Sequence, residues 1–149
     1  MAVQATSLLV QASGGPVTGR AADAIACANT CFEAALRLIR PGKRIWDVAG
    51  PLNKIADAYD CTMVEGVMTH NMKQFVIDGQ KCVLNKPTSD QKVEDGEFEE
   101  NEVYAVDIVV STGALRPFPL LAIWASDAQL HRALQAGNGF RAHAQLHAL

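Results

Sequence analysis

Two side chains in this sequence are of the kinds that bind metal ions or move protons. His70 lies in the stretch THNMKQFVIDGQK, and Asp107 interrupts the apolar stretch EVYAVDIVVSTG. Imidazole and carboxylate groups are common zinc ligands, so a metal site is one interpretation. A histidine on a strand is more often a hydrogen-bonded core residue, and an aspartate in a buried strand needs a partner, a proton or a metal. The residues alone leave both interpretations open.

Other patterns that could carry chemistry point to structure instead. The stretch SGGPVTGR lacks the GK[ST] ending of a phosphate-binding loop, and no GxSxG elbow occurs. The acidic stretch at residues 94–102 does not have the spacing of a calcium loop, so we interpret it as a solvated surface. The four cysteines form no CxxC pair, which favours a reducing compartment: Cys27, Cys31, Cys61 and Cys82. Cys27 and Cys31 lie one helical turn apart, and we interpret them as buried core thiols.

The length and net charge of the chain limit the classes of function that it can have. The chain has 149 residues, 49% of them hydrophobic, which is enough for one globular domain. Its formal net charge is −3, so no global electrostatic attraction to nucleic acid or anionic lipid is expected. The sequence has no secretory signal pattern and no apolar stretch of about 18 residues, so we expect no membrane partner.

Two helices are predicted to support the candidate residues. The first runs through TGRAADAIACANTCFEAALRLIRPG, with Thr18 as candidate N-cap and Pro41-Gly42 after its end. The second covers residues 47–59, where Pro51 is tolerable only in the first turn. Both have apolar residues at helical spacing.

Strands and loops fill the remainder. Extended segments are expected at residues 6–12, after Cys61 and around KCVLN, a surface loop at residues 86–101, and the strongest strand at residues 102–111. Beyond Gly113 the composition changes to Ala, Leu, His and Arg, where only residues 126–135 suggest a helix. We therefore divide the chain into a domain at residues 1–113 and a divergent tail at residues 114–149.

The order and spacing of several stretches resemble a known family. They are VTGRAADAIACANTCFEAALRLIRPG, NKIAD, THNMKQFVIDGQK and EVYAVDIVVSTG, and together they are similar to the middle of the pita-bread fold of methionine-aminopeptidase-like proteins. More narrowly, they resemble the proliferation-associated, ErbB3-binding-protein branch. The resemblance runs from about Val10 to Gly113, roughly two thirds of the chain.

The resemblance assigns family roles to three positions. The active aminopeptidases of type 2 have a metal-binding histidine at the position that matches His70, and a metal-binding glutamate at the position that matches Asp107. They have a substrate-contacting histidine at the position that matches Asp78. Aspartate is one methylene shorter than glutamate, and residues 1–22 offer no Asp, Glu or His. No glutamate follows Asp107 either. We therefore expect no catalytic residue, no cofactor and no intact metal site, with His70 and Asp107 as vestigial positions.

The resemblance also implies a fold. It implies an α+β architecture in which two helices pack on an antiparallel or mixed sheet, as part of a pita-bread domain. We expect the strand at residues 102–111 to keep an unpaired edge or exposed face, through which the chain could self-associate. A truncated gene product is one interpretation of the divergent tail.

Three functions follow as alternatives. The branch implies a catalytically inactive protein that binds ribosomes, structured RNA or regulatory proteins in growth and translation control, in the cytoplasm, nucleus or nucleolus. Arg40, Lys43 and Arg44 form the most basic short segment and are the expected RNA contact. A fragment of a metal-dependent methionine aminopeptidase is the second interpretation, and an interaction domain that binds no RNA is the third.

Overall fold

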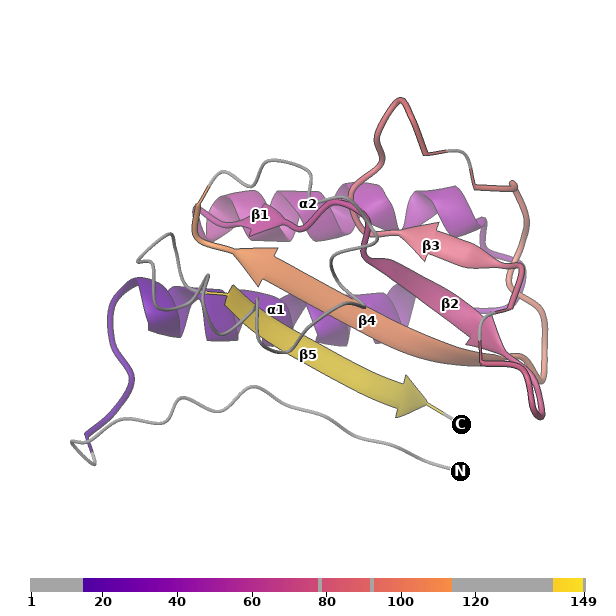
Figure 1. Ribbon diagram of the computed structural model, residues 1–149, viewed down its shortest axis with the longest axis horizontal. Coiled ribbons are helices and arrows are strands. Elements are labelled where there is room, and N and C mark those ends of the chain that lie inside the picture. Colours follow the sequence, from indigo (N-terminus) through magenta and orange to yellow (C-terminus); the bar gives the residue numbers. More distant parts are fainter. Residues whose placement is uncertain (1–14, 78, 92, 114–140, 149) are drawn as a thin grey trace.

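Two helices cover one face of a five-stranded antiparallel sheet (Figure 1). The computed structural model describes residues 15–77, 79–91 and 93–113, and the backbone of residues 141–148. The helical elements are α1 (Arg20–Leu38), the 3-10 helix η1 (Ile45–Asp47) and α2 (Ala49–Ala58). The strands are β1 (Thr62–Met63), β2 (Met68–Met72), β3 (Cys82–Leu84), β4 (Val103–Ser111) and β5 (Arg141–Ala148). This confirms the predicted fold class. The predicted elements at residues 6–12 and 126–135 lie outside the described residues.

Helix α1 follows the predicted apolar stripe. Its buried residues recur every three or four positions, so one face of the helix reaches the core: Ala24, Cys27, Ala28, Cys31, Phe32 and Ala35. The predicted cap is wrong, because Gly19 rather than Thr18 precedes the helix, with φ at 66°. The carbonyl of Gly19 accepts the first helical hydrogen bond, from the Asp23 amide at 3.1 Å.

The second predicted helix is divided in two. Residues 45–47 form η1, and α2 starts only at Ala49. Pro51 has no amide proton to donate to the carbonyl of Asp47, so the α-helical ladder begins with the bond from the Leu52 amide to the Val48 carbonyl, at 3.4 Å. The sequence prediction correctly placed Pro51 in a first turn but missed the 3-10 turn before it.

Arg20 ties the start of α1 to the end of α2. Its guanidinium donates to the carbonyl of Tyr59 at 3.1 Å and to the carbonyl of Asp60. Asp60 has a positive φ of 52°, which turns the chain from α2 toward β1. Arg20 therefore links the two helices at this end, together with the contact of 3.1 Å between Oγ1 of Thr30 and the hydroxyl of Tyr59.

Strand β4 is the centre of the sheet. One of its edges pairs with β1 and β2, and β3 lies outside β2. The other edge pairs with β5 along its length, from Tyr104 opposite Ala148 to Ser111 opposite Arg141 (Figure 1). The prediction that this strand keeps an unpaired edge is therefore wrong. The sequence RAHAQLHA has no β-branched residue, so it gave no strand signal of its own.

The core lies between the helices and one face of β4. Val106, Ile108 and Val110 alternate along that face and are almost fully buried. They share one apolar cluster with the buried face of α1 and with Leu52 and Ala56 of α2. No helix in the described part of the chain is long and apolar enough to cross a bilayer.

Residues 86–101 form the predicted surface loop, with one exception. Phe98 is buried and packs edge-on against Tyr104, with ring centroids 5.2 Å apart. Around it, residues 96–98 run beside residues 42–45, joined by hydrogen bonds such as that from the Ile45 amide to the Gly96 carbonyl at 2.9 Å. The loop is thus anchored to the chain just before η1.

Candidate functional site

The sheet brings His70 and Asp107 together. Strands β2 and β4 are neighbours, and the register places His70 opposite Ala105, so Asp107 lies one pleat further along the same face. The Nε2 of His70 is 3.7 Å from the Oδ2 of Asp107, and each side chain is 17% exposed. The contact is an ion pair only when the imidazole is protonated. The two positions singled out by sequence are therefore spatial neighbours.

The backbone around this pair is fixed by buried polar side chains that sequence reasoning missed. Asn85 is fully buried and donates through Nδ2 to the backbone carbonyl of Asp107 at 2.5 Å. The Asp107 amide donates to Oγ1 of Thr69 at 3.2 Å. Asn53 of α2 donates to the carbonyl of Asn85 at 2.7 Å, which connects the site to the helix layer. Asn85 ends the predicted extended segment KCVLN, and nothing in the neighbouring sequence indicates that its side chain is buried against Asp107.

The residues at this site do not fit a hydrolytic metal centre. Catalytic zinc sites use three protein ligands and an open position, and two-metal sites need more. Across the described residues no group of three His, Cys, Asp or Glu side chains could hold a metal ion. Asp78, the position of the substrate histidine, lies outside the described residues. His70 and Asp107 form a pair that can carry a hydrogen bond or a charge contact.

A second polar cluster holds the β2–β3 hairpin to β4. The Nζ of Lys81 lies 2.6 Å from carboxylate oxygens of both Glu99 and Glu102. The hydroxyl of Tyr104 donates to Glu102 at 2.9 Å. Hydrogen bonds to Glu102 and Glu99 raise the pKa of Lys81. Burial opposes the charged form of Glu102, but the bonds from Lys81, the Glu99 amide and Tyr104 lower its pKa on balance. Lys81 is therefore a structural cation.

The loop between β2 and β3 presents apolar side chains to solvent. Lys73 and Val76 exchange backbone hydrogen bonds of 3.0 and 2.9 Å across a tight turn, with Phe75 at a φ of 65°. Phe75 is 97% exposed and Ile77 is 73% exposed. A bulky residue at positive φ is uncommon and strained. We call residues 73–77 the hairpin tip.

One cation of the basic segment at Arg40, Lys43 and Arg44 is paired with an acidic neighbour. The guanidinium of Arg44 forms an ion pair with Asp95, which raises the pKa of Arg44. The backbone of Arg44 also bridges to Glu97. Arg40 and Lys43 are exposed and form no ion pair with another described residue. Of the three predicted RNA contacts, these two remain available as cations.

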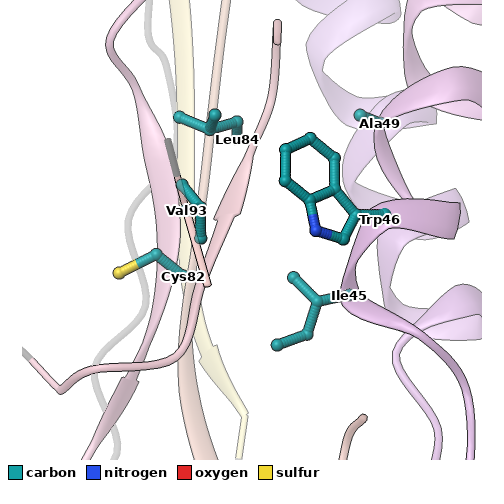
Figure 2. Close-up of a pocket in the computed structure, with 6 residues that line it drawn as sticks. All are labelled: Ile45, Trp46, Ala49, Cys82, Leu84 and Val93. Carbon is teal, nitrogen blue, oxygen red and sulfur yellow. The ribbon is translucent and has the colours of Figure 1, made fainter. Parts of the chain in front are cut away.

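A shallow apolar pocket lies between η1 with the start of α2 on one side and β3 on the other. Ile45, Trp46 and Ala49 form one wall, and Cys82, Leu84 and Val93 form the other. Figure 2 shows the indole of Trp46 directed toward Leu84 and Val93. The indole side is open, since Trp46 is 39% exposed. Sequence reasoning missed this pocket because its walls come from segments about 40 residues apart.

Cys27 and Cys31 are buried thiols, as predicted, and Cys61 is buried as well. Cys27, Cys31 and Cys61 lie in the core, and Cys82 is half-buried. A hydrogen bond with Cys31, together with burial, raises the pKa of the Cys27 thiol. The same bond lowers the pKa of Cys31, against the effect of burial. These thiols pack in the apolar cluster between α1 and α2.

Comparisons with known proteins confirm the resemblance. The chain is 61% identical over 103 residues to ErbB-3 binding protein 1 of Solanum tuberosum, which covers 69% of this chain and 27% of that protein. It is 46% identical over 108 residues to proliferation-associated protein A of Dictyostelium discoideum, and the match covers 72% of this chain and 28% of that protein. It is 48% identical over 99 residues to the curved DNA-binding protein of Schizosaccharomyces pombe, and the match covers 65% of this chain and 26% of that protein. The chain thus spans about a quarter of the length of these relatives. No family model matches it.

Solved structures show the same fold at low sequence identity. A thermophilic Arx1 superposes with a TM-score of 0.66 at 16% identity, covering 98% of this chain and 59% of the other. A methionine aminopeptidase from Thermotoga maritima superposes with a TM-score of 0.66 at 17% identity. That match covers 91% of this chain and 50% of the other. The predicted pita-bread architecture is confirmed. The division of the chain at residue 113 stays a prediction, as do the roles assigned to His70, Asp107, Asp78, Arg40, Lys43 and Arg44.

Proposed function

We propose that this chain, which carries part of a pita-bread domain of the proliferation-associated, ErbB3-binding-protein branch, is a non-catalytic binding protein that contacts structured RNA, as on the ribosome. One observation supports the proposal that the chain is not catalytic. His70 and Asp107 stand together at 3.7 Å, but no third ligand accompanies them among the described residues. Two side chains cannot hold the metal-bound water that hydrolysis of a peptide bond requires.

The exposed cations of the basic segment support an RNA contact. Arg40 and Lys43 lie on the loop between α1 and η1, where neither side chain is used in an ion pair with a described residue. A phosphate backbone would pair with them, and each such contact releases bound counterions. The name of the Schizosaccharomyces pombe relative, a curved DNA-binding protein, also supports a nucleic-acid partner. The compartment proposed with this function is the cytoplasm, with the nucleus or nucleolus as alternatives.

A filter-binding titration with purified ribosomal RNA at two salt concentrations tests the proposal. We expect affinity to fall as salt rises, and the Arg40→Glu/Lys43→Glu variant to bind at least about tenfold more weakly. Lys54→Glu is the control for charge reversal outside this loop, because Lys54 is an exposed lysine on α2. Equal binding by the wild type and the double variant would remove the loop from the RNA interface.

The second candidate is a fragment of a metal-dependent methionine aminopeptidase. The spatial pairing of His70 with Asp107 favours it, because both occupy positions that match metal ligands of that family. Incubation with manganese, cobalt or zinc and a Met-initiated peptide separates the two candidates. Release of N-terminal methionine together with stoichiometric metal binding would establish the second function over the first.

A further inference from the structure

Three thiols meet in the core where α1 contacts the connection between α2 and β1. Cys27 and Cys31 of α1 are fully buried, and Cys61 of the connection is 3% exposed. The thiol of Cys31 donates to the carbonyl of Leu52, with Sγ 3.6 Å from the oxygen. The thiol of Cys61 donates to the carbonyl of Tyr59 at 3.4 Å. The thiol of Cys27 is hydrogen-bonded to both other thiols, so it lies between them.

One pair of these thiols can form a disulfide without distorting a helix. Cys27 and Cys31 stand one turn apart on α1, and residues with this spacing have Cβ atoms about 5–6 Å apart. A disulfide requires Cβ atoms about 3.5–4.5 Å apart, so a bond between these two would distort α1. Cys61 belongs to a separate segment and is hydrogen-bonded to Cys27. Cys27 and Cys61 are therefore the pair that can be joined.

We propose that Cys27 and Cys61 are a redox pair, which hydrogen peroxide converts to a disulfide that fastens α1 to the connection after α2. This goes beyond the RNA contact and does not rest on it. In the first step one sulfur bonds to a peroxide oxygen, the O–O bond breaks, and the departing hydroxide takes the thiol proton and leaves as water. In the second step the other sulfur attacks the sulfenic acid, whose hydroxyl leaves with the second thiol proton as water. Two thiols and one peroxide thus give one disulfide and two waters.

The contacts of Arg20 control access to this pair. Burial and the neighbouring Cys27 raise the pKa of Cys61, so the closed core keeps this thiol protonated and unreactive. The guanidinium of Arg20 holds the carbonyls of Tyr59 and Asp60, the two residues just before Cys61. Breaking these bonds frees the connection that carries Cys61 while the sheet stays paired. Oxidation therefore proceeds through local opening at Arg20.

Peptide mapping identifies the bond. Trypsin releases Cys27 and Cys31 in one peptide, residues 21–37, and Cys61 in another, residues 55–73. The folded chain is treated with hydrogen peroxide, its remaining thiols are alkylated, and it is digested without reductant. We expect mass spectrometry to find the two peptides joined, and dithiothreitol to separate them. Thiols that all stay reduced, or a bond within residues 21–37, would overturn the proposal.

Alanine variants establish which thiols are joined. Each variant also carries Cys82→Ser, because half-buried Cys82 is the thiol through which two copies would cross-link. Cys27→Ala and Cys61→Ala should each abolish the joined peptides, whereas Cys31→Ala should retain them. Joined peptides in Cys27→Ala would contradict the pairing. Fragmentation of the joined peptides from the wild type distinguishes Cys27 from Cys31 without any change to the core.

The rate of oxidation separates local opening from global unfolding. Arg20→Ala should speed formation of the bond at least about tenfold, because two hydrogen bonds that close the connection are lost. Gly79→Ala is the matched control. It strains the base of the β2–β3 hairpin, where a Cβ would lie 2.5 Å from the carbonyl oxygen of Asn71, and leaves the Arg20 contacts intact. Its rate should stay close to that of the wild type. Equal acceleration by both variants would show that the thiols react only from the unfolded chain, which contradicts the proposal.

The disulfide should also stabilise the fold. It closes a loop of 34 positions (61 − 27), which restricts the unfolded chain. We expect the melting temperature of the oxidised wild type to exceed that of the reduced protein by about 5 °C or more. Cys61→Ala should show no such rise after the same treatment. An unchanged melting temperature in fully cross-linked protein would mean that the bond does not fit the native helix layer, and would overturn the proposal.

Discussion

Asp107 lies on the same face of the sheet as His70, with its Oδ2 3.7 Å from the imidazole Nε2, although the two residues are 37 positions apart in the chain (107 − 70). The pairing of β2 with β4 produces this relationship. The family resemblance predicts that these two residues are vestigial metal positions, and that prediction defines what substitution of Asp107 is expected to restore.

Restoring the family's carboxylate should not restore metal binding. Asp107→Glu adds the missing methylene, but a third protein ligand is still absent among the described residues. We expect neither the wild type nor Asp107→Glu to retain stoichiometric manganese, cobalt or zinc after gel filtration, measured by inductively coupled plasma mass spectrometry. One equivalent of metal in Asp107→Glu alone would show that ligands outside the described residues complete the site.

The junction between the helices depends on Arg20. Arg20→Ala removes the donors to the carbonyls of Tyr59 and Asp60 and should lower the free energy of unfolding by about 1–3 kcal/mol. Arg37→Ala is the control, since Arg37 forms only an exposed pair with Glu33 on the same helix, worth about 0.5 kcal/mol or less. Urea unfolding followed by circular dichroism measures both. Equal losses would mean that the contacts of Arg20 do not fix the junction.

The Lys81 cluster should make stability depend on pH at the acid end. The folded-state pKa of Glu102 is lowered from 4.5, so its contribution is present above that value and is lost as pH falls through the lower folded value. Glu102→Gln should cost about 1 kcal/mol at pH 7 and progressively less as pH falls below 4.5. Urea midpoints from pH 3 to 7 give the comparison. A constant difference across that range would assign the loss to packing instead of charge.

The same cluster predicts a second change at alkaline pH. The pKa of Lys81 is raised from 10.5, so its ion pairs stabilise the fold below that value and are lost as pH rises through the higher folded value. Lys81→Met should remove this alkaline dependence while retaining much of the aliphatic packing. Thermal melting between pH 8 and 11 would show it, and identical profiles for the two proteins would contradict it.

Two glycines should respond oppositely to alanine. A Cβ at Gly79 would lie 2.5 Å from the carbonyl oxygen of Asn71 and closer still to its Oδ1, whereas a Cβ at Gly50 meets nothing within 4 Å. Gly79→Ala should therefore destabilise the protein by about 1–3 kcal/mol. Gly50→Ala, in α2, should stabilise it by about 0.5–1 kcal/mol. Differential scanning calorimetry compares the two, and a neutral Gly79→Ala would show that the hairpin base relaxes.

The elements that sequence reasoning predicted are those with strong local patterns. Helix α1 and strand β4 carry long apolar periodicities, so the local sequence indicates them even though packing and strand pairing stabilise them. The 3-10 turn of η1 was missed because its two bonds, from the Asp47 amide to the Arg44 carbonyl and from the Val48 amide to the Ile45 carbonyl, leave no distinct pattern in the sequence. Strand β5 was missed because its pairing with β4 comes from backbone groups, which every sequence possesses.

The candidate site was predicted only in part for a similar reason. His70 and Asp107 were found because a polar residue inside an apolar strand is conspicuous. Asn85 was not, because it stands at the end of the predicted extended segment KCVLN and its partners come from other elements. The pocket at Trp46 and the ion pair of Arg44 with Asp95 depend on how a loop folds back over η1, which no local pattern specifies.

The central place of β4 also has a consequence for the order of folding. The β2–β3 hairpin joins residues as few as 12 positions apart, such as His70 and Cys82 (82 − 70), whereas Thr62 of β1 must find Ser111 of β4 across 49 positions (111 − 62). Closing the longer loop costs more chain entropy. We expect the hairpin to form first and β4 to join late, so pulse-labelled amide exchange should protect Val83 before Ser111.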